Sequence, residues 1–106
     1  MKDAFEVRYT DAARDDLVRL FDFLLERAWT IEDFDDAQAA IDALRAETDG
    51  RLTRTPFIYR KAGQNPFVRE LIVAHRSSGY VVLYEIEGAT HVNILAVRHQ
   101  LEDDYY

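Results

Sequence analysis

The chain has 106 residues, and 13 basic against 20 acidic side chains give it a net charge of −7 with the three histidines neutral. This length supports one hydrophobic core, so we expect a single domain over residues 1–106 and exclude two independently folding units. The lack of cysteine excludes disulfides and thiolate chemistry, and no apolar run is long enough for a bilayer span or an evident export signal, so we expect a cytoplasmic protein.

A strand and a long helix are predicted at the start of the chain. Residues 4–9 alternate between apolar and polar side chains, which is the period of a half-buried strand. Thr10 is a suitable N-cap for a helix over residues 11–28, because apolar residues recur there at helical spacing. The apolar arc of this helix is unusually wide, since it also includes Val18, Phe23, Leu25 and Trp29. Either both sides of the helix are buried within the domain, or part of the arc binds a partner chain.

A second helix is predicted over residues 33–49. Thr30 and Asp33 have the spacing of a capping box, and apolar side chains recur after them at intervals of three and four residues. Gly50 suits the left-handed residue that follows a helix, although one more turn through Leu52 is compatible with the pattern. The short join predicts that the two helices form an antiparallel hairpin.

The second half of the chain predicts a loop and three strands. Residues 53–66 contain both prolines of the chain and are expected to form a long loop. The period then changes to two, which predicts strands over residues 67–75, 79–87 and 91–98, joined as a meander. The middle strand is apolar on both faces, as in a central strand covered on each side. The predicted fold class is α+β, in the order β-α-α-β-β-β, with an N-terminal strand and an antiparallel helical hairpin packed on one face of a mainly antiparallel sheet.

Charge is distributed unevenly along the chain. Residues 1–50 hold 6 basic and 14 acidic side chains, whereas residues 51–106 hold 7 and 6. The cations of residues 51–76 are Arg51, Arg54, Arg60, Lys61, Arg69 and Arg76, against the single acid Glu70. Such a segment suits phosphate or an acidic protein, but the field of the whole molecule repels polyanions at long range. We therefore expect no direct nucleic-acid binding.

General sequence motifs give no support for a cofactor enzyme. The chain lacks the glycine-rich nucleotide loops, the serine-hydrolase elbow and the zinc-protease helix motif. The spacing of His75, His91 and His99 places no two of them on one helical face, as a metal site on a helix requires. The adjacent Asp103 and Asp104 are more typical of a solvated end than of a magnesium pair. We expect no cofactor and no metal.

RNA cleavage by general acid–base chemistry is the enzyme class that such a fold suits. It requires cations that hold phosphate and a base directed at a 2′-hydroxyl. The candidate side chains are Arg69, Arg76, Arg98, His99 and Tyr106. They are few and dispersed in an acidic chain, so the residues by themselves support this activity only weakly.

Four short runs in the second half of the chain form a recognisable pattern. They are Arg76-Ser77-Ser78-Gly79-Tyr80, Val82-Leu83-Tyr84, Ile94-Leu95-Ala96-Val97-Arg98-His99-Gln100 and Asp103-Asp104-Tyr105. With the order of the elements, this pattern resembles the RelE/ParE superfamily of toxins from type II toxin-antitoxin systems. The resemblance implies one of two activities. RelE-type toxins cleave mRNA on the ribosome, whereas ParE toxins inhibit DNA gyrase by binding.

The resemblance also bears on the choice between these activities. RelE-type nucleases carry basic catalytic side chains at positions that match Ile72, Ala74, Val81 and Gln100 of this chain, and none of these is charged. Only their terminal tyrosine is matched, by Tyr106. Without the cations, the charge that develops on the cleaved phosphate is not stabilised. The resemblance therefore favours the ParE-like branch.

The sequence thus implies a ParE-like toxin, not an enzyme, that inhibits DNA gyrase and is neutralised by a ParD-like ribbon-helix-helix antitoxin in a hetero-oligomer. Histidine-dependent nucleases exist in the superfamily, so His75 and His99 keep RNA cleavage open, and a non-toxic family member is the other alternative. The residues expected to contact the antitoxin are Val18, Phe21, Leu25, Trp29, Phe34 and Ile41. Unless the tail is only a solvated terminus, the residues expected to contact the target are Arg76, Arg98, His99, Gln100, Asp104, Tyr105 and Tyr106.

Overall fold

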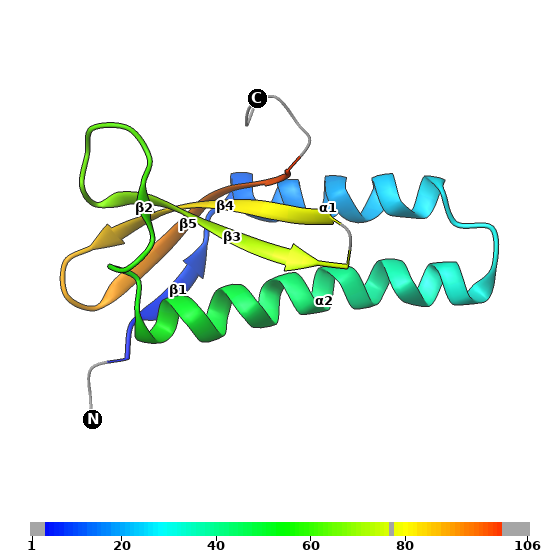
Figure 1. Ribbon diagram of the computed structural model, residues 1–106, viewed down its shortest axis with the longest axis horizontal. Helices are drawn as coiled ribbons and strands as arrows, with labels where there is room; N and C mark the ends of the chain where they lie inside the picture. Colours follow the sequence, from blue (N-terminus) through cyan, green and yellow to red (C-terminus); the bar gives the residue numbers. More distant parts are fainter. Residues whose placement is uncertain (1–3, 77, 101–106) are drawn as a thin grey trace.

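The computed structural model describes residues 4–76 and 78–100. Its elements are β1 (Glu6–Tyr9), α1 (Asp11–Glu26), α2 (Ile31–Arg54), β2 (Arg60–Lys61), β3 (Val68–His75), β4 (Ser78–Glu87) and β5 (His91–His99). The strands form one sheet in the order β1-β5-β4-β3-β2, and the two helices lie antiparallel to each other on one face of it (Figure 1). The joined ends of the helices project beyond the sheet (Figure 1). This arrangement confirms the predicted α+β fold.

The sheet is antiparallel except at one edge. β3, β4 and β5 form the meander that the sequence predicts, and β1 lies parallel to β5, with Glu6 opposite His91. In the central strand β4, Val81 and Val82 point to opposite faces, yet both are at most 1% exposed. The expectation of a central strand covered on each side is therefore confirmed.

The core lies between the helical hairpin and the sheet. Its largest fully buried side chains include Leu44 and Leu52 of α2, Leu71 of β3, Tyr84 of β4 and Ile94 of β5. The phenol of Tyr84 donates a 2.6 Å hydrogen bond to the carbonyl oxygen of Pro56, so its buried hydroxyl is satisfied. Within the described residues, neither helix combines the length and the apolar character that a membrane crossing requires.

Helix α2 is longer at both ends than the predicted range of 33–49. It begins at Ile31 because Thr30 is the N-cap: the Thr30 hydroxyl accepts from the Asp33 N–H at 3.0 Å, and the Asp33 carboxylate accepts from the Thr30 N–H at 3.3 Å. The capping box is thus confirmed. Gly50 does not end the helix, because Leu52 continues the buried stripe one turn further and is fully buried. Pro56 then prevents a further helical turn.

The predicted loop of residues 53–66 is only partly irregular. Its first two residues complete α2, and the short strand β2 pairs with β3, with Arg60 opposite Glu70. The two side chains of this pair also form a 2.8 Å ion pair. A two-residue strand is too short to give a periodic signal in the sequence.

Helix α1 ends at Glu26, two residues before the predicted end, and its wide apolar arc is not covered by the domain. Val18 is 59% exposed, Phe23 is 45% exposed, and Trp29, in the turn after the helix, is 92% exposed. The expectation that both sides of this helix are buried is therefore wrong for these three side chains. Leu25 is half-buried.

A buried carboxylate joins α1 to the sheet. Asp16 is 3% exposed and accepts a 2.8 Å hydrogen bond from the backbone N–H of Val97 on β5. Arg19, one turn further along α1, donates to the carbonyl oxygen of Val97 at 3.2 Å and lies 3.8 Å from the Asp16 carboxylate. The pairing of β1 with β5 ends at Tyr9 opposite Ile94. Beyond that point, the side chains of Asp16 and Arg19 complete the backbone hydrogen bonds of β5 in place of the strand.

Candidate functional site

The sheet face turned away from the helices, called the far face below, is the first candidate site. On β3, Leu71 and Val73 are buried against the helices, so Ile72 between them belongs to the far face. Ile72 is opposite Val81 on β4, and Val81 is opposite Arg98 on β5. The structure thus places three residues that are distant in the sequence side by side across three strands.

The centre of the far face is apolar at the positions that the sequence resemblance matches to nuclease cations. Ile72, Ala74 and Val81 supply aliphatic side chains at three of these four positions. The fourth, Gln100, is exposed, and its backbone N–H donates to the carbonyl oxygen of Gly79 at 2.9 Å. Val81 is only 1% exposed, so the accessible apolar side chains here are those of Ile72 and Ala74. Arg98 lies beside Val81 on this face, and the three aliphatic positions themselves offer nothing to stabilise the charge of a cleaved phosphate.

The second candidate site is a hollow of about 260 Å³ between the helical hairpin and the end of the β3–β4 ribbon. Its polar lining consists of Asp33, Asp36, His75, Arg76, Tyr80 and His99. The guanidinium of Arg76 lies 3.3 Å from the Asp36 carboxylate, and this carboxylate neutralises part of the Arg76 charge. The rings of Tyr80 and His99 stack edge to face with centroids 5.6 Å apart, and burial raises the pKa of the Tyr80 phenol.

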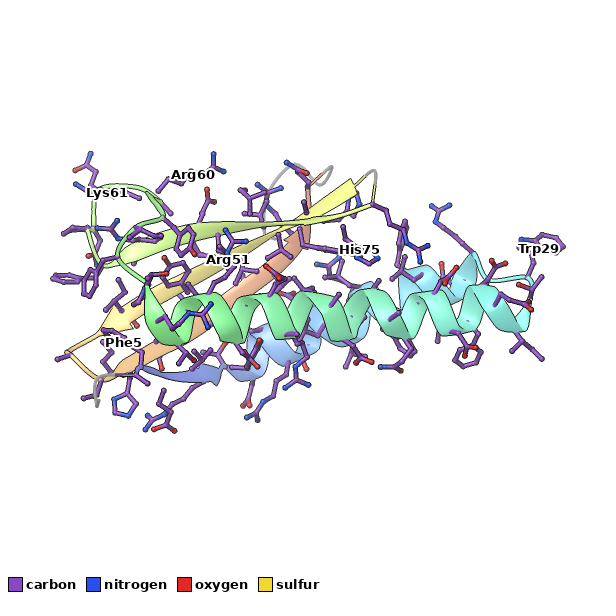
Figure 2. All side chains as sticks on the ribbon, turned by 60° about the horizontal axis from the view of Figure 1, so that its bottom comes forward. Phe5, Trp29, Arg51, Arg60, Lys61 and His75 are labelled. Carbon is purple, nitrogen blue, oxygen red and sulfur yellow. The ribbon has the colours of Figure 1, made fainter. Side chains whose placement is uncertain are left out.

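The residues predicted to contact the target are only partly brought together. Arg76 and His99 line the hollow together with His75, which lies beside α2 (Figure 2). Arg98 lies on the far face instead, where its Nη1 donates to the carbonyl oxygen of His99 at 3.3 Å. The predicted contacts Asp104, Tyr105 and Tyr106 lie outside the described residues.

Several cations of residues 51–76 stabilise the fold and do not form one patch. Arg69, a candidate for phosphate binding, donates to the carbonyl oxygens of Pro66, Phe57 and Tyr59 at 2.7–2.9 Å. Arg51 donates to the Ile72 carbonyl oxygen at 3.2 Å. The prediction of Arg69 as a nuclease cation is therefore not supported, since its guanidinium is engaged by backbone carbonyls.

A metal centre has no support in the described part of the chain. The residues at 4–76 and 78–100 contain no group of three or more His, Cys, Asp or Glu side chains placed to hold an ion. His91, the third histidine, lies far from the hollow, between Arg8 and Glu6 of β1, with its Nε2 at 2.7 Å and 3.3 Å from their side chains.

The third candidate site is a groove of about 340 Å³ between α1 and α2. Leu17, Val18 and Phe21 of α1 and Ile41 of α2 form its apolar lining. Its polar lining includes Arg14, Gln38 and Arg45, and the Arg45 guanidinium lies 5.1 Å from the ring centre of Tyr9. An apolar groove with an arginine from each helix suits an amphipathic segment that carries carboxylates.

Most of the residues predicted to contact the antitoxin lie along this groove. Val18, Phe21 and Ile41 line it directly, although Ile41 is only 8% exposed and belongs mainly to the core. Leu25 is one helical turn after Phe21, and Phe34 is one turn before Gln38, so both extend the same helix faces toward the hairpin tip. Trp29 stands apart from the groove at that tip (Figure 2).

Sequence reasoning missed two features. The groove cations Arg14 and Arg45 were not singled out, although each stands at helical spacing from a predicted apolar contact. An exposed apolar group at the other end of the molecule, formed by Phe57, Ile58 and Phe67, was also missed, because it comes from a loop without periodicity.

Comparisons with known proteins agree with the fold. A family model described as the ParE toxin of the type II toxin-antitoxin system parDE matches residues 7–104. A solved structure of a chromosomal ParDE toxin-antitoxin system from P. aeruginosa has a similar fold, with a TM-score of 0.70 and 14% sequence identity. That match covers 92% of this chain and 98% of the other. No curated protein sequence matches this chain.

Proposed function

The chain belongs to the ParE toxin family of type II toxin-antitoxin systems, and from this premise we propose that it inhibits DNA gyrase by binding and does not cleave RNA. Its place of action is then the cytoplasm, where it is held inactive in a hetero-oligomer with a ParD-like ribbon-helix-helix antitoxin. The proposal needs no cofactor and no metal.

One observation carries this proposal: the far face is apolar where nuclease relatives carry cations. Ile72 and Val81 are directly opposite each other at the centre of this face, and Ala74 follows on β3. Removing a single preorganised donor from a catalytic site typically costs a factor of about 10²–10³ in rate. Three aliphatic side chains at such positions favour a toxin that acts by binding.

The alternative activity, a histidine-dependent nuclease, has less support. His75 and His99 do line one hollow, as such an activity requires. The same hollow also contains Asp33 and Asp36, whose negative charges oppose the approach of a phosphate. Burial raises the pKa of Tyr80, which makes its phenol a poorer general base at neutral pH.

The groove between the helices is the proposed site for the antitoxin. Its apolar lining of Val18, Phe21 and Ile41 suits the apolar face of a helical segment, and Arg14 and Arg45 suit carboxylates on the flanks of that segment. The edge strands β1 and β2 offer backbone groups to an additional strand of the same partner. The exposed Trp29 extends the contact to the hairpin tip.

Antitoxin affinity tests this assignment. We expect Val18→Asn and Trp29→Ala to weaken binding of the purified antitoxin about tenfold or more, because each removes apolar area from the contact. Ala39→Asn, at an exposed position of α2 outside the groove, is the matched control and should bind as wild type does. Wild-type affinity in both Val18→Asn and Trp29→Ala, with normal folding, would show that the antitoxin binds elsewhere.

A supercoiling assay tests the proposed target. Purified gyrase with relaxed plasmid should lose supercoiling activity as the toxin is added, and the antitoxin should restore it. A second arm uses the chain truncated after Arg98, which removes the predicted target contacts His99, Gln100, Asp104, Tyr105 and Tyr106. Undiminished inhibition by the truncated chain would exclude the tail as a target contact, and undiminished supercoiling with the full chain would exclude gyrase as the target.

A further inference from the structure

An exposed apolar group lies at the end of the molecule opposite the hairpin tip. Phe57, Ile58 and Phe67 are 48%, 70% and 51% exposed, and together they are called the loop-end patch below. The ring of Phe5 lies next to it, with its centroid 5.9 Å from that of Phe57. Figure 2 shows Phe5 and Trp29 at opposite ends of the molecule, whose longest dimension is 45 Å. The loop-end patch is therefore separate from the hairpin tip.

The backbone of the loop-end patch is held in place by several hydrogen bonds. The Arg69 guanidinium joins the carbonyl oxygens of Phe57 and Pro66, each at 2.9 Å, so it links the two halves of the loop. The Ile86 N–H donates to the carbonyl oxygen of Phe67 at 2.8 Å, which fixes the end of the loop to β4. A loop ordered in this way loses little conformational entropy when a partner covers it.

The segment that carries most of the loop-end patch is basic, in contrast to the rest of the chain. Residues 51–69 contain five cations and no acidic residue. Arg51 and Arg69 bind backbone carbonyls, and Arg60 pairs with Glu70. Arg54 and Lys61 are exposed in the same segment, so their charges face solvent. An apolar centre with a positive rim is complementary to an apolar socket rimmed by carboxylates.

We propose that the loop-end patch is the surface with which the toxin holds its target protein, and that the target contributes an acidic surface with an apolar socket. This inference rests on the proposed function, because it presumes a toxin that acts by binding. The loop-end patch is distinct from the proposed antitoxin groove, whose apolar lining lies on α1 and α2.

The test compares substitutions at the two ends of the molecule. Ile58→Asn removes the most exposed side chain of the loop-end patch, and Lys61→Glu reverses a charge beside it. Ile31→Asn is the matched control, since Ile31 is 79% exposed at the start of α2. Each variant is measured for inhibition of purified gyrase holoenzyme, for growth arrest on expression, for antitoxin affinity, for unfolding and for oligomeric state.

Ile58→Asn and Lys61→Glu are expected to need about tenfold or more protein for half-inhibition of gyrase and to lose growth arrest. Unfolding midpoint and oligomeric state should match those of wild type and of Ile31→Asn, and Ile58→Asn should keep wild-type antitoxin affinity. The inference is overturned if both patch variants inhibit and arrest growth as wild type does, if they lose antitoxin affinity instead, or if they change only self-association. If the wild-type protein arrests growth without inhibiting gyrase, gyrase is excluded as the target, and the growth-arrest comparison alone then decides on the patch.

Discussion

Replacing Asp16 with alanine is expected to destabilise the protein strongly. The Asp16 carboxylate is 3% exposed and accepts from the Val97 N–H at 2.8 Å, and Val97 itself is 1% exposed. The substitution removes a hydrogen bond to a charged group and leaves a backbone N–H without its partner in a site closed to water. It also leaves Arg19 without the carboxylate at 3.8 Å.

The expected loss in the free energy of unfolding is about 2–4 kcal/mol, since a hydrogen bond to a charged group contributes about 1.5–3 kcal/mol and an unsatisfied buried donor adds to the cost. For a domain of this size, that loss lowers the melting temperature by roughly 10–20 °C. Urea unfolding followed by circular dichroism measures the first quantity, and a thermal scan measures the second. Asp16→Asn keeps an acceptor and should lose less.

Asp15→Ala is the matched control, because Asp15 is the exposed neighbour on the same helix and should change stability by less than about 0.5 kcal/mol. If Asp16→Ala were no more destabilising than Asp15→Ala, the carboxylate would not hold α1 on β5, and the reasoning from burial and hydrogen bonding would be refuted.

Two further predictions concern helix α2. Thr48→Val should raise the free energy of unfolding by about 1 kcal/mol, because the buried Thr48 hydroxyl has no hydrogen-bond partner among the described residues; a lower urea midpoint would contradict this. Hydrogen bonds from the backbone N–H groups of Trp29 and Thr30 lower the pKa of Asp33 below 3.8, so the unfolded chain binds that proton at higher pH than the folded chain does. Asp33 therefore stabilises the folded state at pH values above its unfolded pKa, and this contribution is lost as the pH falls through its folded pKa. Asp33→Asn should flatten the acid side of a profile of unfolding free energy against pH. An unchanged profile would exclude this.

Much of the fold follows from local patterns in the sequence. The period of two predicts β3, β4 and β5, and the capping box at Thr30 and Asp33 is formed as expected. The end of α2 was not predicted, because Gly50 is a common helix stop and only the burial of Leu52 in the tertiary structure outweighs it. The role of Asp16 also depends on where β1 ends relative to β5, which periodicity does not reveal.

The candidate sites follow from the sequence less completely. Helical spacing predicts the apolar lining of the groove, because Val18, Phe21 and Ile41 belong to regular helices. It does not predict that Arg69 turns inward to backbone carbonyls, nor that Ile58 is held outward, since both depend on hydrogen bonds across an irregular loop. Register between strands brings Ile72, Val81 and Arg98 together, although the sequence places them up to 26 positions apart.

The central claim is that this toxin obstructs its target and does not cut RNA. The most direct measurement is the length of mRNA recovered from programmed ribosomes after incubation with the purified protein, at concentrations that stop gyrase in a parallel reaction. The account predicts full-length mRNA at every concentration that blocks supercoiling. Fragments whose ends map to the ribosomal A site, formed at those concentrations, would contradict it.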